Sequence, residues 1–241
     1  MRILNSSIIA FIILICVASC KKDSLFGIIG KGKTVTEVRY VNGFTKINLS
    51  LDGDLNYVQD SVYYVEVKAQ SNILPVLKTQ IEGDILNIKF KGVIWKHSPV
   101  RIIVHSPEIN GFDVNGSGDI YAGDIINTNK LDLSISGSGD ISVSSIKGQD
   151  LDASISGSGS ININGGSLKY EKLVVSGSGS INSINVLCLT TSGKISGSGN
   201  ITINVVEMLY AKISGSGDIK YRGTPSVDAE ISGSGKVQHI N

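Results

Sequence analysis

The sequence predicts an all-β fold, a right-handed parallel β-helix or β-solenoid with about 18–21 residues in each coil. Three observations predict it. The tripeptide Gly-Ser-Gly occurs seven times, at intervals of 21, 20, 20, 20, 18 and 18 residues. Alternate residues around each copy are apolar, as in strands that bury one face. A fixed period of this length is typical of solenoids, in which each repeat buries its apolar face against the next.

The two glycines of each tripeptide lie on the inward side of this alternation. In "LDLSISGSGDISV" (131–143), every odd-numbered residue is apolar or glycine. We expect glycine at a tight corner between two short strands because an inward side chain has no room there and the bend requires a positive φ. The expected corner glycines are Gly116, Gly118, Gly137, Gly139, Gly157, Gly159, Gly177, Gly179, Gly197, Gly199, Gly215, Gly217, Gly233 and Gly235.

Polar side chains face outward at the same corners. The serine between the glycines and the residue after them are expected to stack into columns, in which neighbouring hydroxyls hydrogen-bond at about 0.2–1 kcal/mol per pair. We interpret these columns as a binding ladder. Its expected members are Ser117, Asp119, Ser138, Asp140, Ser158, Ser160, Ser178, Ser180, Ser198, Asn200, Ser216 and Asp218.

The first 33 residues indicate a targeting segment and a tether. Arg2, an apolar run over 8–16 and the sequence Val-Ala-Ser-Cys at 17–20 resemble a bacterial lipoprotein signal. We therefore expect a signal peptide at 1–19, lipidation of Cys20 and a lipidated tether at 20–33. The acyl chains would anchor the protein in the outer membrane of the cell envelope, facing the periplasm or the surface. The alternative is an ordinary signal peptide that happens to be cleaved before a cysteine.

The remainder, 34–241, is expected to form one β-helix domain. Residues 34–110 alternate like strands but lack the repeat, so they predict irregular N-terminal coils that cap the rod, and 111–241 predict the regular coils. A separate small domain at 34–110 is the alternative there. A sandwich or barrel of hairpins is a weaker alternative for the repeats, since it gives no reason for Gly-Ser-Gly to recur in every corner.

Several segments together resemble a known family. They are the lipoprotein signal, "GFTKINLSLDGDLNYVQ" (43–59), "ILPVLKTQIEGDILNIKF" (73–90), "VRIIVHSPEINGFDVNGSGDI" (100–120) and the repeated GSGxI units. This combination is similar to the auto-transporter adhesin family with a head GIN domain, found among envelope lipoproteins of Bacteroidota-type bacteria. The resemblance covers roughly 37–236. It implies a β-helical domain outside the cytoplasm, and it implies neither a particular ligand nor catalytic residues.

The sequence predicts no catalytic residue, metal site or cofactor. His97, His105 and His239 are scattered, and no GxSxG motif surrounds any serine of the repeats. Asp119 and Asp140 would be neighbours in the ladder, but two carboxylates are too few for the six to eight oxygens of a calcium site. A formal net charge of +1 gives no electrostatic reason to expect nucleic acid as a partner.

Two further features also have a structural interpretation. Cys188 is the only cysteine left after the expected processing, so it predicts a packed thiol without a disulfide partner. The string GIIGKGKT at 27–34 matches a phosphate-binding loop, but the residues after it alternate like a strand, whereas that loop requires a helix. We therefore expect no nucleotide site.

The favoured function is a non-catalytic, adhesin-like binding module that presents the polar ladder to a glycan or an envelope protein. One alternative is a structural envelope scaffold, which would form a homo-oligomer through the ends of the solenoid. A second is a polysaccharide lyase-like enzyme, for which Asp140 or Arg222 would have to be required for product release.

Overall fold

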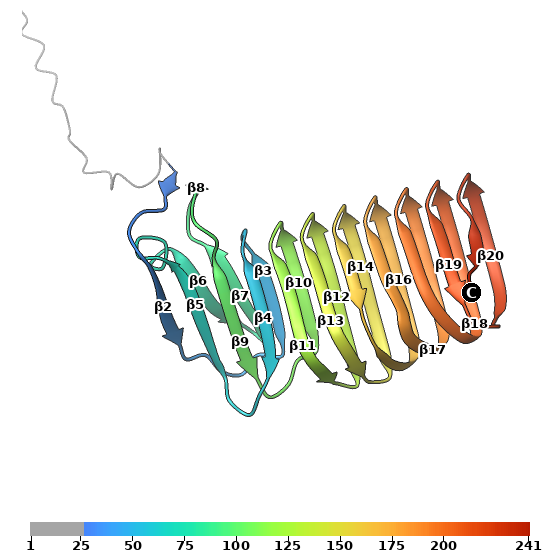
Figure 1. Cartoon of the computed structure of the whole chain (residues 1–241), viewed down its shortest axis with the longest axis horizontal. Coiled ribbons are helices and arrows are strands. Elements are labelled where there is room, and N and C mark those ends of the chain that lie inside the picture. Colours follow the sequence, from blue (N-terminus) through green and yellow to red (C-terminus); the bar gives the residue numbers. More distant parts are fainter. Residues whose placement is uncertain (1–26) are drawn as a thin grey trace, which may run out of the picture.

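The computed structural model describes residues 27–241, which form 21 β-strands and no helix. The strands stack side by side along the long axis of the molecule (Figure 1), as a β-solenoid of about six turns. The predicted all-β solenoid is confirmed. The expected signal peptide, Cys20 and the first residues of the expected tether lie outside the described residues. No helix capable of crossing a membrane is present between residues 27 and 241.

Each coil has two long faces, and on each face the strands of successive coils pair parallel to one another. In stacking order, the first face contains β3 (Lys46–Ser50), β10 (Gly111–Gly116), β12 (Lys130–Gly137), β14 (Asp150–Gly157), the later parts of β16 (Gly166–Gly177), β17 (Ser180–Gly197) and β18 (Asn200–Gly215), and β20 (Ser226–Gly233). The second face contains β4 (Asp54–Gln59), β11 (Asp119–Asn127), β13 (Asp140–Lys147), β15 (Ser160–Ile163), the first parts of β17 and β18, β19 (Asp218–Arg222) and β21 (Val237–His239).

The coils stack in register, so that equivalent residues of successive repeats form columns. On the first face, Ile135 pairs with Ile155 and Ile155 with Val175, and each side chain is at most 1% exposed. On the second face, Ile141 pairs with Ile161 in the same way. Burying each such side chain contributes about 1.5–3 kcal/mol. These columns form the core that runs along the solenoid axis.

The paired glycines are needed because the coils lie so close together. Gly157 has a φ of 144°, and a Cβ there would overlap the carbonyl oxygen of Gly137 in the preceding coil. Gly159 does not have a positive φ, but its Cβ would overlap the carbonyl oxygen of Gly139. The bend therefore requires a positive φ only at the first glycine, and the lack of room comes from the neighbouring coil more than from the inside of the corner.

The segment before the repeats does not follow a simple succession of coils. The strands β7 (Ile85–Phe90) and β9 (Arg101–Ser106) pair parallel with β3 and β4 on the side away from β10 and β11. The coil of β3 and β4 therefore lies between two coils that follow it in sequence. The sequence predicts irregular coils for 34–110, and parallel pairing of β3 with β10 and of β4 with β11 joins this segment to the regular coils.

Antiparallel strands cover the outer side of this segment (Figure 1). On the first face β6 (Leu77–Glu82) pairs with β7, and on the second face β5 (Tyr64–Gln70) pairs with β9 and β2 (Thr34–Arg39) pairs with β5. A small separate sheet of β1 (Ile28–Ile29) and β8 (Ile94–Lys96) lies beside them. The string that matches a phosphate-binding loop therefore runs through β1 into β2.

The C-terminal coil has no such cover. Every residue of β20 is exposed, including Val227 and Ile231, although Ile231 continues the column in which Ile213 is buried. Within the described residues, no further strand lies beyond β20 or β21. The parallel coils are therefore covered by antiparallel strands at the N-terminal end, where the outermost strand β2 is itself exposed, and they are left open at the C-terminal end.

Candidate binding surfaces

The acidic and amide residues of the ladder hold successive coils together. Asp119 Oδ1 accepts the backbone N–H of Asp140 at 2.9 Å, and Asp140 Oδ1 accepts that of Ser160 at 2.8 Å. Asp218 Oδ1 accepts the backbone N–H of Lys236 at 2.9 Å. The pattern is interrupted at Ser160, since the backbone N–H of Ser180 is accepted by a glycine carbonyl oxygen at 3.1 Å, and it resumes at Asn200, whose Oδ1 accepts the backbone N–H of Asp218 at 3.3 Å. These ladder residues therefore satisfy backbone groups, which reduces the number of their oxygens available to a ligand.

The serines between the glycines remain exposed. Among residues 27–241, the structure shows no hydrogen bond from one of these hydroxyls to the next along the column, in contrast to the expected hydroxyl ladder. From Ser138 onward, the backbone N–H of each serine is used by the stack, as when Ser158 donates to the carbonyl oxygen of Gly137 at 2.9 Å. The column therefore presents a row of hydroxyl groups at one corner of the solenoid.

A groove with exposed tyrosines crosses the outward side of the first face. It has a volume of about 430 Å³ and lies over β14, β16, β17 and β18. Tyr170 pairs with Thr190, and Tyr210 pairs with Ser192, so that the two rings flank the Thr190 and Ser192 hydroxyls. Tyr170 is 58% exposed and Tyr210 is 46% exposed. We call this site the tyrosine groove.

Ion pairs line one side of the tyrosine groove. Lys130 Nζ lies 2.6 Å from Asp152 Oδ2 and 3.1 Å from Asp132 Oδ1. These hydrogen bonds raise the pKa of Lys130. Partial burial alone would raise the pKa of Asp132, but hydrogen bonds from Lys46 and Lys130 hold it below its ordinary value. The groove therefore combines two aromatic rings with hydroxyl groups and fixed charges.

A buried polar cluster lies beneath the same groove. Glu171 is only 2% exposed, and it accepts hydrogen bonds from Thr191 Oγ1 at 2.8 Å and Ser183 Oγ at 3.1 Å. Burial raises the pKa of Glu171 to about 7. The sequence analysis missed this residue, although the repeat period places it on the inward side, in register with Leu151 and Thr191. Aligning the repeats by pairing partner would have found it.

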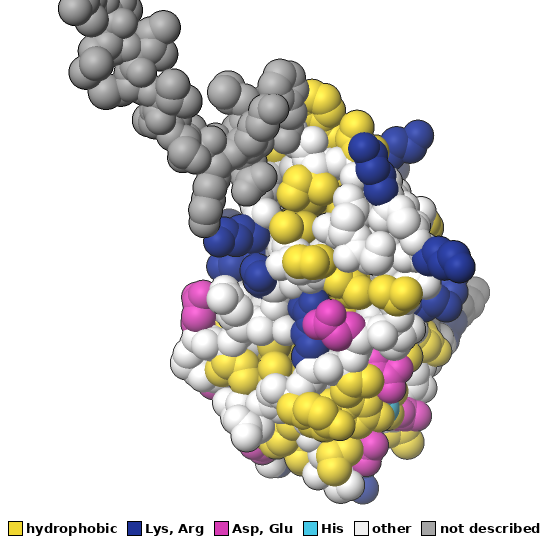
Figure 2. Space-filling model, turned by 90° about the vertical axis from the view of Figure 1, so that its left-hand side faces the viewer, with side chains coloured by type: hydrophobic (Ala, Val, Ile, Leu, Met, Phe, Trp, Pro, Cys, Tyr) yellow, Lys and Arg dark blue, Asp and Glu magenta, His cyan; other side chains and the backbone are white. Residues whose placement is uncertain are grey.

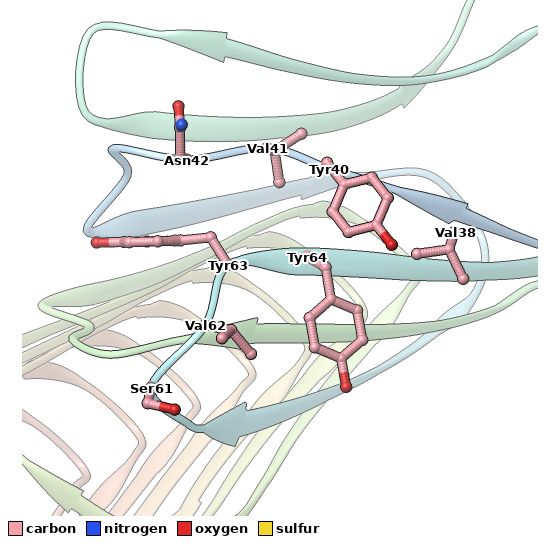
Figure 3. A pocket seen from close by; sticks show the side chains of 8 residues that line it. All are labelled: Val38, Tyr40, Val41, Asn42, Ser61, Val62, Tyr63 and Tyr64. Carbon is pink, nitrogen blue, oxygen red and sulfur yellow. The ribbon is translucent and has the colours of Figure 1, made fainter.

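An apolar hollow of about 770 Å³ lies at the N-terminal end (Figure 3). It is formed where β2 ends and β5 begins, with the side chains of Val38, Tyr40 and Tyr64 close to one another in Figure 3. Tyr64 also stacks on His105, with 4.0 Å between the ring centroids. The remaining lining residues are Val41, Asn42, Ser61, Val62 and Tyr63. Sequence reasoning missed this hollow because it is built from the part of the chain without repeats.

The described residues contain no group of three or more His, Cys, Asp or Glu side chains placed to hold a metal ion. His105 Nδ1 lies 3.4 Å from Asp60 Oδ2, and His239 has an edge contact with Tyr221. Cys188 is buried, and this burial raises the pKa of its thiol to about 12. A thiol with such a pKa stays protonated at neutral pH and is a poor nucleophile.

The comparison with protein families identifies the chain. The family described as "Putative auto-transporter adhesin, head GIN domain" matches residues 43–225, which is most of the chain. The chain therefore belongs to this family, as its motifs predict. Membership of this adhesin family indicates a protein of the cell envelope or cell surface. No curated protein matches the chain.

Solved structures share the same fold. The chain is 25% identical to a putative adhesin from Bacteroides fragilis, with a TM-score of 0.84 over 89% of this chain and 100% of that one. It is 24% identical to a putative lipid binding protein from Parabacteroides distasonis, with a TM-score of 0.79 over 90% of this chain and 100% of that one. A putative adhesin from Parabacteroides merdae gives 24% identity and a TM-score of 0.75, over 89% and 99% of the two chains.

Proposed function

We propose that this protein is a non-catalytic, adhesin-like lipoprotein of the cell envelope, anchored in the outer membrane through Cys20, that binds a glycan. The tyrosine groove is the proposed main contact. The exposed serines of the ladder extend the polar surface along the corner of the solenoid. A protein partner from the envelope is the other ligand class that such a ladder predicts, and the glycan is favoured by the aromatic rings.

The observation that carries this proposal is the placement of Tyr170 and Tyr210 on either side of the Thr190 and Ser192 hydroxyls. A sugar ring has an apolar face and a rim of hydroxyl groups. An exposed aromatic ring packs against such a face, and hydroxyl and charged side chains exchange hydrogen bonds with the rim. Because adjacent coils lie about 4.8 Å apart, the two rings are separated by two coils, or roughly 10 Å. This distance suits an oligosaccharide better than a single sugar.

The geometry favours binding over catalysis. Glu171 lines the groove and has a strongly perturbed pKa, which is a property of many catalytic acids. Its carboxyl group, however, faces the core and is held by Thr191 and Ser183, so that a ligand in the groove does not reach it. The register also separates Asp140 from Arg222, since Asp140 is followed in its column by Ser160, Ser180 and Asn200 before Asp218, which lies in the coil of Arg222.

A glycan array with the purified protein tests the proposal. We expect binding to a subset of oligosaccharides, and we expect Tyr170→Ala and Tyr210→Ala each to weaken that binding at least about tenfold, which corresponds to roughly 1.4 kcal/mol. The matched control is Tyr121→Ala. Tyr121 is similarly exposed but lies on the second face, so its loss should leave glycan binding unchanged.

Two results would contradict the glycan proposal. One is an array on which no glycan binds the wild-type protein. The other is a bound glycan whose affinity is the same for the wild type and for both groove variants, with thermal melting confirming that all variants are folded.

A structural scaffold is the second candidate, and the open C-terminal end favours it. The strand β20 offers unpaired backbone groups together with exposed Val227 and Ile231, which is the type of edge that pairs with another chain. If the protein assembles in this way, size-exclusion chromatography with light scattering should show a dimer or larger species that Ile231→Lys converts to monomer. A protein that is monomeric at all accessible concentrations would rule out this candidate.

A further inference from the structure

One part of the N-terminal end combines exposed apolar side chains with lysines. It consists of residues 27–33 and 91–97, which contain β1 and β8, and we call it the basic-aromatic lobe. Its exposed apolar residues are Ile29, Val93 and Trp95, and Trp95 is 62% exposed. Figure 2 views the molecule from this end and shows hydrophobic side chains gathered there, with Lys and Arg side chains at the margins.

The charged side chains of the lobe are all positive. Four lysines lie in its two segments, and neither segment contains Asp or Glu. All four lysines are exposed, and no ion pair of theirs occurs within the described residues. They are Lys31, Lys33, Lys91 and Lys96. A protein with a net charge of only +1 therefore carries a compact basic surface next to an exposed indole ring.

The lobe is held firmly against the body of the solenoid. The backbone N–H of Ile28 donates to the carbonyl oxygen of Val93 at 2.8 Å, which joins the two segments. Asn72 accepts the backbone N–H of Lys31 at 2.7 Å and donates to the carbonyl oxygen of Ile29 at 2.9 Å. Gln70 accepts the backbone N–H of Ser98 at 2.8 Å. The exposed apolar side chains are thus presented on a fixed surface.

The position of the lobe in the sequence limits how far it can be from a lipid anchor. Gly27 begins the described chain and lies at the lobe, and Cys20 precedes it by seven residues. Seven residues span at most about 25 Å even when fully extended. If Cys20 carries lipid, the lobe therefore lies within that distance of the bilayer surface.

We propose that the basic-aromatic lobe docks on the surface of a phospholipid bilayer that contains anionic lipids. Trp95 enters the interface between head groups and acyl chains, where indole rings are enriched, and the four lysines contact the anionic head groups. The docked lobe sets the solenoid with its N-terminal end on the membrane and its open C-terminal end away from it. This inference rests on the proposed lipid anchor at Cys20.

Trp95 is the only tryptophan of the chain, so its fluorescence reports on the lobe alone. The lipidated full-length protein would be reconstituted into vesicles of phosphatidylethanolamine and phosphatidylglycerol. We expect the Trp95 emission to shift to shorter wavelength, to be quenched by brominated phospholipid, and to be protected from acrylamide several-fold relative to a Cys20→Ser protein in solution.

Charge-reversal variants sharpen this test. The triple variant Lys31→Glu, Lys91→Glu and Lys96→Glu should remain attached through its anchor but lose most of the quenching by brominated lipid. The matched control, Lys147→Glu, Lys169→Glu and Lys194→Glu, makes the same change in net charge at exposed lysines of the regular coils. It should behave like the wild type.

The possible results separate the two proposals. A wild-type protein that does not associate with vesicles shows that the anchor is missing, and both the anchor and the docking are then wrong. A protein that associates while Trp95 stays as accessible to acrylamide as in solution keeps the anchor and overturns the docking. Equal loss of quenching in both triple variants overturns the role assigned to the lobe.

Discussion

The two ends of the solenoid solve the same problem differently. At the N-terminal end, β2, β5 and β6 run antiparallel and cover the coil of β7 and β9, so that Leu86 and Ile102 are fully buried. At the C-terminal end β20 lies uncovered, and its inward residues Val227 and Ile231 are 41% and 47% exposed. An end strand presents unpaired backbone groups and an apolar column, which a protein must cover or use.

The difference shows what each coil gains from its neighbours. The repeats share the Gly-Ser-Gly motif and the apolar alternation around it, and Ile155, Ile213 and Ile231 occupy the same place in their coils. Only the presence of a following coil makes the first two buried and the last one exposed. Matched substitutions in a middle coil and in the last coil therefore measure the contribution of stacking directly.

The largest effect is expected for valine at a corner glycine. In Gly157→Val the new side chain overlaps the Gly137 carbonyl oxygen and requires a φ of 144°, so we expect the protein to lose its cooperative fold. The same change at Gly233 meets the Gly215 carbonyl oxygen, but the last coil can detach without disturbing the others. Thermal melting should therefore show a native-like transition for Gly233→Val.

Ser158→Val is the control for these glycine variants because this side chain points outward and is exposed. It should change the melting temperature by no more than a few degrees. Equal destabilisation by Gly157→Val and Ser158→Val would contradict the packing of the corner.

Smaller effects are expected for two separate truncations in one buried column, one in a middle coil and one in the last coil. Ile155→Ala should lower the free energy of unfolding by about 2–5 kcal/mol, because it leaves a cavity in a covered part of the core. Ile231→Ala removes a half-exposed side chain and should cost less than about 1 kcal/mol. Urea titration of both variants measures these values, and equal losses would mean that the C-terminal coil is covered in solution.

A further comparison concerns the buried carboxyl group of Glu171, which lies in the inward column that ends at Val227. Below a pH of about 4.5 the Glu171 carboxyl is protonated in both the folded and the unfolded chain, so its ionisation does not lower the free energy of unfolding. As the pH rises to about 7, the unfolded chain loses this proton while the folded chain retains it, so stability falls by up to roughly 3 kcal/mol. Glu171→Gln should abolish this fall and be the more stable protein at pH 8.

Val227→Glu provides the matched control at the open end. Val227 continues the column of Glu171 through Thr191 and Leu209, but it is exposed. An acid there should titrate normally and add no pH dependence above pH 5. If denaturation at a series of pH values instead showed that Glu171→Gln leaves the pH dependence unchanged, the burial of Glu171 would be wrong.

The sequence predicts the regular coils well because their physical determinants repeat. The period of Gly-Ser-Gly gives the coil length, and the alternation around it gives the buried columns, such as that of Ile135 and Ile155. The route of the chain through β3, β4, β7 and β9 was not predictable in this way. No repeat marks which strands are neighbours there, and the pairing depends on long-range contacts between alternating segments of similar appearance.

The binding surfaces were predicted only in part. The serines between the paired glycines are exposed as their outward parity indicates, but the sequence did not show that Asp119 and Asp140 are used to hold the next coil. The tyrosine groove was missed because Tyr170 and Tyr210 belong to different positions of the repeat and are brought to the same groove only through the register of β16, β17 and β18. Residues that depend on the pairing of coils are visible only once that register is known.

Hydrogen exchange of the backbone amides, measured on the monomeric protein, tests the central claim that one end of the solenoid is covered and the other open. We expect amides of β20 to exchange by local fraying, well before global unfolding, whereas amides of β7, which β6 covers near the other end, should be as protected as those of β12. Equal protection of β20 and β7 would contradict it.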